Sequence, residues 1–335
     1  MVLVTGGTGF LGAHLLYYLI KNNNKVRAIK RTSSDLEFVR KIFLYYTKDA
    51  DSYFNKIEWV NADVLDYESI LKNIDNIETV YHCAAFVSFD KKDKEKVLQI
   101  NVKGTENIVN ACLEKNLKLC HTSSIAAISE KNSDNYFTEE IGATNPSKKS
   151  TYAKSKYLSE MEVWRGIEEG LDAVIVNPAV IIGLGKWKEG SAKIFTQVHK
   201  GMKFYTTGVT GYVDVRDVAQ IMIKLVEKKI SSERFILSSE NITYRDYFSD
   251  IAENINVKKP SIEASEFLLK IAYIFDNIRA KLTFTNKVIT KEITEAAVRK
   301  SYYSNSKIKE QLNYSFIPVN ETIKYMTKEF LIEND

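Results

Sequence analysis

The sequence predicts an α/β fold: a doubly wound parallel sheet with a smaller, mainly helical C-terminal lobe. Three observations support this prediction. An apolar run at the N-terminus leads into a glycine-rich turn and then into a segment with helical spacing. Up to about residue 180, short apolar runs alternate with amphipathic segments, which is typical of parallel strands covered by helices on both faces. From about residue 243 the spacing is helical.

The turn after the first predicted strand carries Gly6, Gly9 and Gly12 at the spacing GxxGxxG. A first glycine permits the sharp turn, a second leaves room for a pyrophosphate against the backbone, and a third lets the helix lie close to the strand. The free N–H groups and the positive dipole end of the helix then face the phosphates. Because these glycines follow a strand and open a helix, we interpret the segment as a Rossmann-type dinucleotide site and not as an ordinary turn.

The residues that follow the second predicted strand, 25–29, bear on which dinucleotide binds. They read KRTS, which places Arg31 at this point, and no carboxylate occurs before Asp35. In such sites a carboxylate bonds the 2′-hydroxyl of NAD, whereas an arginine accommodates the 2′-phosphate of NADP. A guanidinium beside hydroxyl groups suits a phosphate, so the sequence favours NADP over NAD. The alternative interpretation is a solvated basic turn.

The third and fourth predicted strands end at the same edge of the sheet. The third ends at Asp63 and Val64. We leave two interpretations of Asp63 open, an acceptor for the adenine amine or the N-terminal cap of the short helix that follows. The fourth strand, 79–83, runs into Ala84 and Ala85, whose small side chains let a cofactor approach the backbone.

Tyr152 and Lys156 are four residues apart in a segment with helical spacing, so they share one helix face. A phenol with a pKa of about 10 is a poor acid or base at neutral pH, and a neighbouring ammonium lowers that pKa. The fifth predicted strand, 117–123, leads to Ser123 and Ser124, and Ser124 would bond the same substrate oxygen. Alone, this spacing also fits a surface helix with a buried tyrosine. The spacing indicates a catalytic site because it follows the glycine turn and the serine pair, and all three are predicted at the same edge of the sheet.

Composition excludes several classes of function. The 335 residues are 44% apolar and 27% charged, with a formal charge of +4 and interleaved signs, so we expect no nucleic-acid partner. Three cysteines without CxxC spacing and four scattered histidines predict free thiols and no metal site. No stretch approaches the ~20 apolar residues of a membrane helix, and the first residues already belong to a strand. We therefore expect a cytoplasmic protein without stable membrane insertion or a signal peptide.

At this point the chain resembles a known family, the extended short-chain dehydrogenase/reductases, also called the NAD-dependent epimerase/dehydratase family. The resemblance runs from Met1 to about Asp217 and more loosely to the end, and it rests on the TGGTGFLG turn, on Asp63-Val64, on the NVKG motif that begins at Asn101, and on Ser124 and Tyr152-xxx-Lys156. The resemblance implies that Tyr152 is the acid/base and that Ser124 orients the substrate oxygen. It also implies that Lys156 lowers the tyrosine pKa and holds the nicotinamide ribose.

Asn101, in a helix predicted over 94–113, would join a water-linked proton relay or, equally, act as a helix-packing amide. The family often forms a homodimer through this helix and the helix 152–168, and here either could instead be exposed. The residues expected to bind the cofactor are Gly6, Thr8, Gly9, Phe10, Leu11, Gly12, Arg31, Asp63, Val64, Ala84, Ala85, Tyr152, Lys156 and Pro178.

Within the family, sugar-nucleotide dehydratases usually follow the active hydroxyl with Asp-Glu, and sugar epimerases have Tyr-Gly a few residues on. Here Ser124 is followed by IAAIS. The run Thr122-Ser-Ser124 is closer to the dihydroflavonol-4-reductase-like and hydroxysteroid dehydrogenase branch, which usually prefers NADP. We therefore expect an NADP-dependent oxidoreductase that reduces a carbonyl, or oxidises the alcohol, of a small organic substrate. The alternatives are a nucleotide-sugar epimerase/dehydratase with tightly bound NAD and a non-catalytic dinucleotide-sensing protein.

The remaining strands and helices complete two expected lobes. Residues 1–177 with about 212–238 would form the NAD(P)-binding domain, and about 178–211 with 239–335 the substrate-binding lobe. In the second lobe, one predicted helix has a long apolar face, formed by Phe267, Leu268, Ile271, Ile274, Phe275 and Ile278. We expect this helix to pack on the second lobe, with a lid or a membrane-surface contact for an oily substrate as the alternative.

Overall fold

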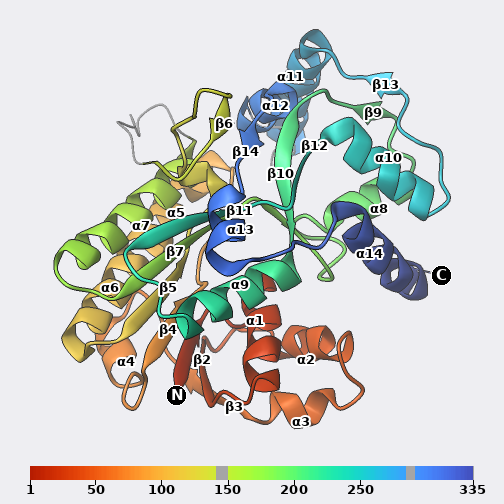
Figure 1. Ribbon diagram of the computed structural model, residues 1–335. Helices are drawn as coiled ribbons and strands as arrows, with labels where there is room; N and C mark the ends of the chain where they lie inside the picture. The colour runs from red at the N-terminus through yellow and green to blue at the C-terminus, as the bar shows by residue number, and fades with distance from the viewer. Residues whose placement is uncertain (141–149, 284–290, 335) are drawn as a thin grey trace.

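A seven-stranded parallel sheet forms the centre of the larger lobe (Figure 1). The computed structural model describes residues 1–140, 150–283 and 291–334. The strands of the sheet are, in spatial order, β11 (Glu233–Leu237), β7 (Ala173–Pro178), β5 (Lys118–Thr122), β4 (Thr79–His82), β1 (Val2–Thr5), β2 (Val26–Lys30) and β3 (Ile57–Asn61). The chain passes from β3 at one edge back to β4 beside β1. This reversal of strand order is where ligands bind in open α/β sheets, and the predicted Rossmann-type sheet is confirmed.

Helices cover both faces of this sheet (Figure 1). One face carries α1 (Phe10–Lys21), α2 (Leu36–Leu44), α3 (Ala50–Phe54) and α9 (Val215–Glu227). The other carries α4 (Tyr67–Leu71), α5 (Lys94–Leu98), the π-helical turn η2 (Gln99–Lys103), α6 (Gly104–Lys115) and α7 (Thr151–Glu168). Because both faces are covered, every residue of β1, β4 and β7 is buried, which explains why these strands read as continuous apolar runs.

The second lobe has small sheets and several helices. The strands are β8 (Val180–Ile182), β10 (Val209–Asp214) and β12 (Glu240–Thr243) in one sheet, β9 (Phe204–Tyr205) with β13 (Ile262–Glu263), and β6 (Tyr136–Phe137) with β14 (Tyr302–Tyr303). The helices are α8 (Lys193–His199), α10 (Tyr244–Asn254), α11 (Glu266–Thr283), α12 (Lys291–Val298), α13 (Ser306–Leu312) and α14 (Val319–Asn334). Short 3-10 turns occur at η1 (Lys91–Asp93) and η3 (Ile125–Ala127).

The structure differs from the sequence-based expectations at two helices. The helix predicted over 94–113 is interrupted by η2, because the Asn101 side chain bonds groups outside the helix. Of the described residues of its predicted apolar face, α11 exposes Phe267, Leu268, Ile274 and Phe275 and half-buries Ile271, so the expectation that it packs through this face on the second lobe is wrong. The side chain of Ile278 lies outside the described part of the chain. Among the described helices, none is both long and apolar enough to cross a membrane. The boundaries between the two lobes stay a prediction.

Candidate active site

The glycine turn between β1 and α1 is so tight that side chains would not fit in it. Gly6 has a φ of +68°, and a Cβ there would lie 2.6 Å from the backbone nitrogen of Ala84. A Cβ on Gly12 would lie 2.1 Å from the Gly6 carbonyl oxygen. The N-terminus of α1, where Gly9 is the cap and Phe10 and Leu11 begin the helix, has no side-chain cap. Its first amide groups therefore remain available to an anion.

A cavity of about 520 Å³ lies against this turn, at the carboxyl ends of β1 to β4. The cavity is lined by residues of four loops and one helical segment, namely Gly6, Thr8, Gly9, Ile29, Arg31, Ser34, Ala62, Asp63, Val64, Leu65, Cys83, Ala84, Ala85, Phe86, Lys96, Gln99 and Ile100. The size and the glycine floor fit part of a dinucleotide. Eight of the residues that we expected to bind cofactor are thus brought together, although they come from segments far apart in the chain.

The other expected cofactor residues do not line this cavity, and Tyr152 and Lys156 among them lie on α7. Phe10 lines a second cavity, of about 210 Å³, together with Gly185 and Lys186. Leu11 and Gly12 are buried in α1. Pro178 ends β7, two strands along the sheet from β4. The glycine turn therefore separates two hollows, of which only the larger meets the sheet edge.

Two cations line the cavity, at different points. Arg31 follows β2, whereas the Lys96 ammonium of α5 lies 4.4 Å from the centre of the Phe86 ring, in the loop after β4. Asp35, the first carboxylate after β2, caps α2 by accepting from the Phe38 amide and pairs with Lys186 at 2.9 Å. The Asp35 carboxylate therefore already has two partners, the Phe38 amide and the Lys186 ammonium. Arg31 therefore offers a cation to an anionic group at the β2 end of the cavity.

Asp63 lines the same cavity, and its role as a helix cap is excluded. Its carboxylate accepts from the amide of Leu65 at 3.0 Å, within its own loop. The cap of α4 is Asp66, whose carboxylate accepts from the amide of Ser69 at 3.1 Å. The capping interpretation of Asp63 is therefore wrong, while the adenine contact stays a prediction.

Tyr152 and Lys156 lie on α7, where it meets the carboxyl end of β5. Ser150 caps this helix by accepting from the Ala153 amide at 3.2 Å, which places Tyr152 in the first turn. The buried Lys156 ammonium donates to the carbonyl of Thr122, the last residue of β5, at 2.8 Å. The Ser124 hydroxyl accepts from the Ala126 amide at 3.1 Å, and Ser124 is close enough to Tyr152 to lower the pKa of its phenol.

Burial dominates the acid–base properties of this trio. Burial raises the pKa of Tyr152, and Ser124 only partly opposes this. The Lys156 ammonium binds the Thr122 carbonyl, and its effect on the Tyr152 pKa stays a prediction. Burial also lowers the pKa of Lys156 to about 8, with Cys83 and Glu160 acting in the opposite direction. At neutral pH the phenol thus holds its proton and the ammonium its charge.

Two contacts connect this trio to the cavity. The Cys83 thiol, which lines the cavity, lies 3.5 Å from the Thr122 hydroxyl. The Asn101 carboxamide accepts from the Phe86 amide at 2.7 Å and donates to the Phe86 carbonyl at 3.1 Å and the Ser155 hydroxyl at 2.9 Å. Asn101 thereby fastens the loop after β4 to α7, which is the packing role. Its part in a proton relay stays a prediction.

A buried ion pair next to the site was missed by the sequence analysis. Glu160 and Arg234 are 1% and 6% exposed, and the guanidinium donates to the carboxylate at 2.6 Å. The same carboxylate accepts from the Ser123 hydroxyl at 2.6 Å and from the Asn177 amide at 2.7 Å. Ser123 is thus committed to Glu160, and Ser124 is the serine that faces Tyr152. The signal available in the sequence was the spacing from Lys156 to Glu160, one further turn of α7.

A second buried chain of hydrogen bonds runs behind the cavity. The Ala84 amide donates to the Thr5 hydroxyl at 3.3 Å, and this hydroxyl lies 2.7 Å from Nδ1 of His82. Nε2 of His82 lies 3.0 Å from the Thr105 hydroxyl, which donates to the Asn101 carbonyl at 2.6 Å. Because Thr105 uses its proton there, His82 must donate from Nε2 and accept at Nδ1. Burial lowers the pKa of His82 to about 3, so this chain joins Ala84 to η2 through a neutral imidazole.

Comparison with known proteins agrees with this geometry. A family model described as the NAD dependent epimerase/dehydratase family matches residues 2–237. The chain is 28% identical to sterol demethylase protein B of Methylococcus capsulatus, over 83% of this chain and 82% of that protein. It is also 28% identical to a putative dihydroflavonol 4-reductase of Synechocystis, over 92% and 88%. The crystal structure of gox2253 aligns with a TM-score of 0.81 at 26% identity, over 99% of this chain and 98% of that one.

The family model covers well over half of the chain, and the relatives include reductases matched over most of their length. The family binds a nicotinamide dinucleotide, which the glycine turn and the adjoining cavity accommodate. The chain therefore belongs to the NAD dependent epimerase/dehydratase family, in its dihydroflavonol 4-reductase-like branch, and is an NAD(P)-dependent oxidoreductase.

Proposed function

We propose that this enzyme uses NADPH to reduce the carbonyl group of a small organic substrate, with Ser124, Tyr152 and Lys156 as its catalytic residues. The observation that carries the proposal is their arrangement. Ser124 lies next to Tyr152, where it lowers the pKa of the phenol, and Lys156 lies one turn further along α7 at the end of β5. Cys83, which lines the cavity beside the glycine turn, lies 3.5 Å from the Thr122 hydroxyl at the end of β5.

The choice of NADP rests on the charges near β2. Arg31 lines the cavity just after β2, whereas Asp35 is engaged with Lys186. A 2′-phosphate would meet the Arg31 guanidinium there. The hydroxyls of Thr8 and Ser34, which also line the cavity, lie 3.4 Å from each other. Asp63, the acid among the lining residues, sits after β3, where we assign it to the adenine.

The chain's own residues supply the acid and the orientation for reduction. The Tyr152 phenol is protonated at neutral pH, so it can donate a proton to the carbonyl oxygen as negative charge develops there. The Ser124 hydroxyl holds the same oxygen through a second hydrogen bond. Lys156 keeps its charge below about pH 8 and would bind the nicotinamide ribose. When bound, the reduced nicotinamide supplies the hydride that adds to the carbonyl carbon, which balances the proton taken by oxygen.

We assign an apolar substrate, such as a phenolic, polyketide-like or sterol-like carbonyl. The Phe89 ring contacts the Tyr152 ring edge to face, with 5.6 Å between their centres, and Phe89 is exposed, as is Val87 in the same loop. Exposed apolar side chains at this point favour a ring-containing substrate over a sugar. The names of the relatives, a sterol demethylase protein and a dihydroflavonol 4-reductase, agree with this class.

The test is to titrate NADPH and NADH by fluorescence against the wild type, Arg31→Asp, and the control Arg299→Asp in the second lobe. The expected result is that NADPH binds more tightly than NADH. Because a charge-assisted bond is lost, Arg31→Asp weakens NADPH about tenfold or more and leaves NADH nearly unchanged. Equal wild-type affinities together with an unaffected Arg31→Asp would refute the choice of NADP. Purified protein that carries NAD and converts UDP-sugars without consuming NADPH would refute the reductase.

A further inference from the structure

Helix α11 is packed with its apolar face outward. Phe267 and Phe275 are 71% and 68% exposed, and Leu268 and Ile274 are exposed as well. At about 100° per residue, these side chains fall within about a third of the helix circumference. This is the width of face that an amphipathic helix normally buries against its own protein.

The opposite side of α11 is the side that meets the protein. Leu269 and Tyr273 are half-buried there, and Asp276 is buried and bonded by the Arg279 guanidinium at 2.7 Å. Packing a helix through its acid, while four large apolar side chains face outward, sacrifices hydrophobic stabilisation in the isolated chain. Large exposed apolar faces are typical of surfaces that bind an apolar partner, which would cover this face.

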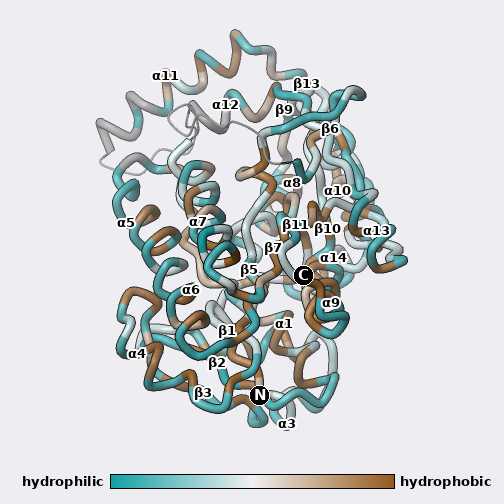
Figure 2. The backbone as a smooth tube through the Cα atoms, turned by 60° about the vertical axis from the view of Figure 1, so that its left-hand side comes forward, coloured by the Kyte–Doolittle hydropathy of each residue, from teal (hydrophilic) through white to brown (hydrophobic). Residues whose placement is uncertain are grey.

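The apolar face continues onto the neighbouring strands. Phe204 of β9 and Ile262 of β13 are partners in register, and both are exposed. We call these two residues together with Phe267, Leu268, Ile274 and Phe275 the apolar patch. β13 leads directly into α11, where the Leu269 amide donates to the Ser265 carbonyl at 2.9 Å. Figures 1 and 2 both show α11 at the opposite end of the molecule from β3 and α3.

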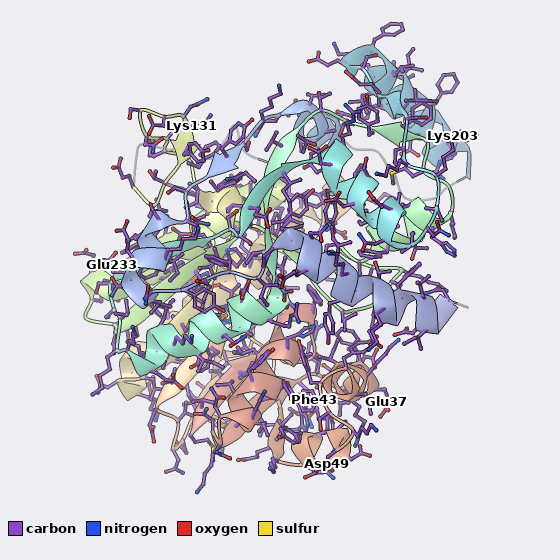
Figure 3. All side chains as sticks on the ribbon, turned by 45° about the vertical axis from the view of Figure 1, so that its right-hand side comes forward. Glu37, Phe43, Asp49, Lys131, Lys203 and Glu233 are labelled. Atoms are coloured by element: carbon purple, nitrogen blue, oxygen red, sulfur yellow. The ribbon has the colours of Figure 1, made fainter. Side chains whose placement is uncertain are left out.

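Lysines outnumber acidic residues in the segments that carry the apolar patch. Segments 200–205 and 257–275 contain five lysines against two glutamates. All five are exposed, although Lys259 pairs with Glu253 of α10; they are Lys200, Lys203, Lys258, Lys259 and Lys270. Figure 3 labels Lys203 at this end of the molecule. On α11 itself, Lys270 flanks one edge of the apolar face and Arg279 the other.

We propose that the apolar patch docks on the surface of an anionic lipid bilayer. Apolar side chains flanked by long cationic ones suit the boundary between acyl chains and headgroups, because the aliphatic stems of lysines reach outward to anionic groups. A second copy of the chain fits less well, since it would bring two sets of these lysines together. The contact is interfacial, and α11 lies along the surface without crossing the bilayer.

The test is flotation of the full chain with vesicles of equal parts phosphatidylglycerol and phosphatidylcholine, and with vesicles of phosphatidylcholine alone. The expected result is binding to the anionic vesicles that weakens with added salt and is about tenfold lower on the neutral ones. Phe267→Ser with Phe275→Ser should lower the binding about tenfold. The matched control is Leu44→Ser with Ile332→Ser, two exposed apolar residues outside the apolar patch, which should bind like the wild type.

Unchanged NADPH titrations and thermal melts show that each variant is folded and separate this result from the proposed reductase activity. Absence of wild-type binding to the anionic vesicles would overturn the proposal. Equal binding by the two double variants would overturn it as well. So would light scattering that shows a wild-type dimer which Phe267→Ser with Phe275→Ser converts to a monomer, because a second copy would then cover the apolar patch.

Discussion

Helices α9 and α11 both have apolar residues at helical spacing, but α9 buries these side chains and α11 exposes them. In α9, Val218, Ile221, Met222 and Leu225 are fully buried between α1 and the sheet. In α11 the corresponding face is exposed. The spacing predicts the helix and the direction of its apolar face in both cases. It does not tell whether the covering surface belongs to the same chain.

The two regions also hold their charges differently. The sheet half buries the pair Glu160 and Arg234 in a fully bonded network beside the site. The lobe with α11 has the pair Lys259 and Glu253 on its surface. The carboxylate of the buried pair accepts from Ser123 and from Asn177 of β7, next to Ser124. We therefore expect mutation of the buried pair to lower the free energy of unfolding, and mutation of the surface pair to leave it unchanged.

The largest expected effect comes from breaking the buried pair. Glu160→Ala leaves Arg234 buried without its carboxylate and frees the Ser123 hydroxyl, so the free energy of unfolding should fall by about 3–5 kcal/mol. Glu253→Ala, which breaks the surface pair, should leave the unfolding midpoint unchanged. Urea denaturation of both variants checks this. Equal losses in the two variants would contradict the contrast between the regions.

A matched pair of isoleucines tests the two helices directly. Ile221→Ala in α9 removes a fully buried side chain and should lower the free energy of unfolding by about 2–5 kcal/mol. Ile274→Ala in α11 should change it by less than about 0.5 kcal/mol, because that side chain is already exposed. Chemical denaturation of the two proteins measures both values. A large loss for Ile274→Ala would show that α11 is buried in solution.

A smaller effect should appear in the pH dependence of stability. The folded chain holds Lys156 at a pKa of about 8, below its ordinary value of 10.5. Between these values the unfolded chain binds the proton and the folded chain does not, so the unfolding free energy rises with pH. Relative to Lys156→Met, the wild type should therefore gain roughly 1–3 kcal/mol from pH 7 to pH 10. Lys270→Met, on the surface of α11, should show no such gain, and a flat difference for Lys156→Met would refute the burial argument.

The parts predicted correctly depend on short stretches of sequence. The glycine turn needs only Gly6, Gly9 and Gly12 between a strand and a helix. Arg31, Asp63 and Ala84 each follow a strand, and the carboxyl ends of neighbouring parallel strands meet at one edge. Local pattern and one topological rule were therefore enough to bring these residues to the same cavity.

The parts not predicted depend on partners that are distant in the sequence. The turn η2 forms around Asn101, whose partners Phe86 and Ser155 are 15 and 54 residues away. Arg234 reaches Glu160 across 74 residues. The choice between Asp63 and Asp66 as helix cap is a matter of loop geometry that the order of residues does not reveal. The direction of the Tyr152 pKa shift depends on burial, which spacing along a helix does not give.

The central claim is that the Tyr152 phenol donates the proton in carbonyl reduction, and Tyr152→Phe tests it most directly. Consumption of NADPH is followed with a panel of ring-containing carbonyl compounds, beside fluorescence titration of NADPH. With an accepted carbonyl, the account predicts that kcat falls by about 10²–10⁴-fold while the affinity for NADPH is unchanged, because only the general acid is removed. Undiminished turnover by Tyr152→Phe would contradict the account.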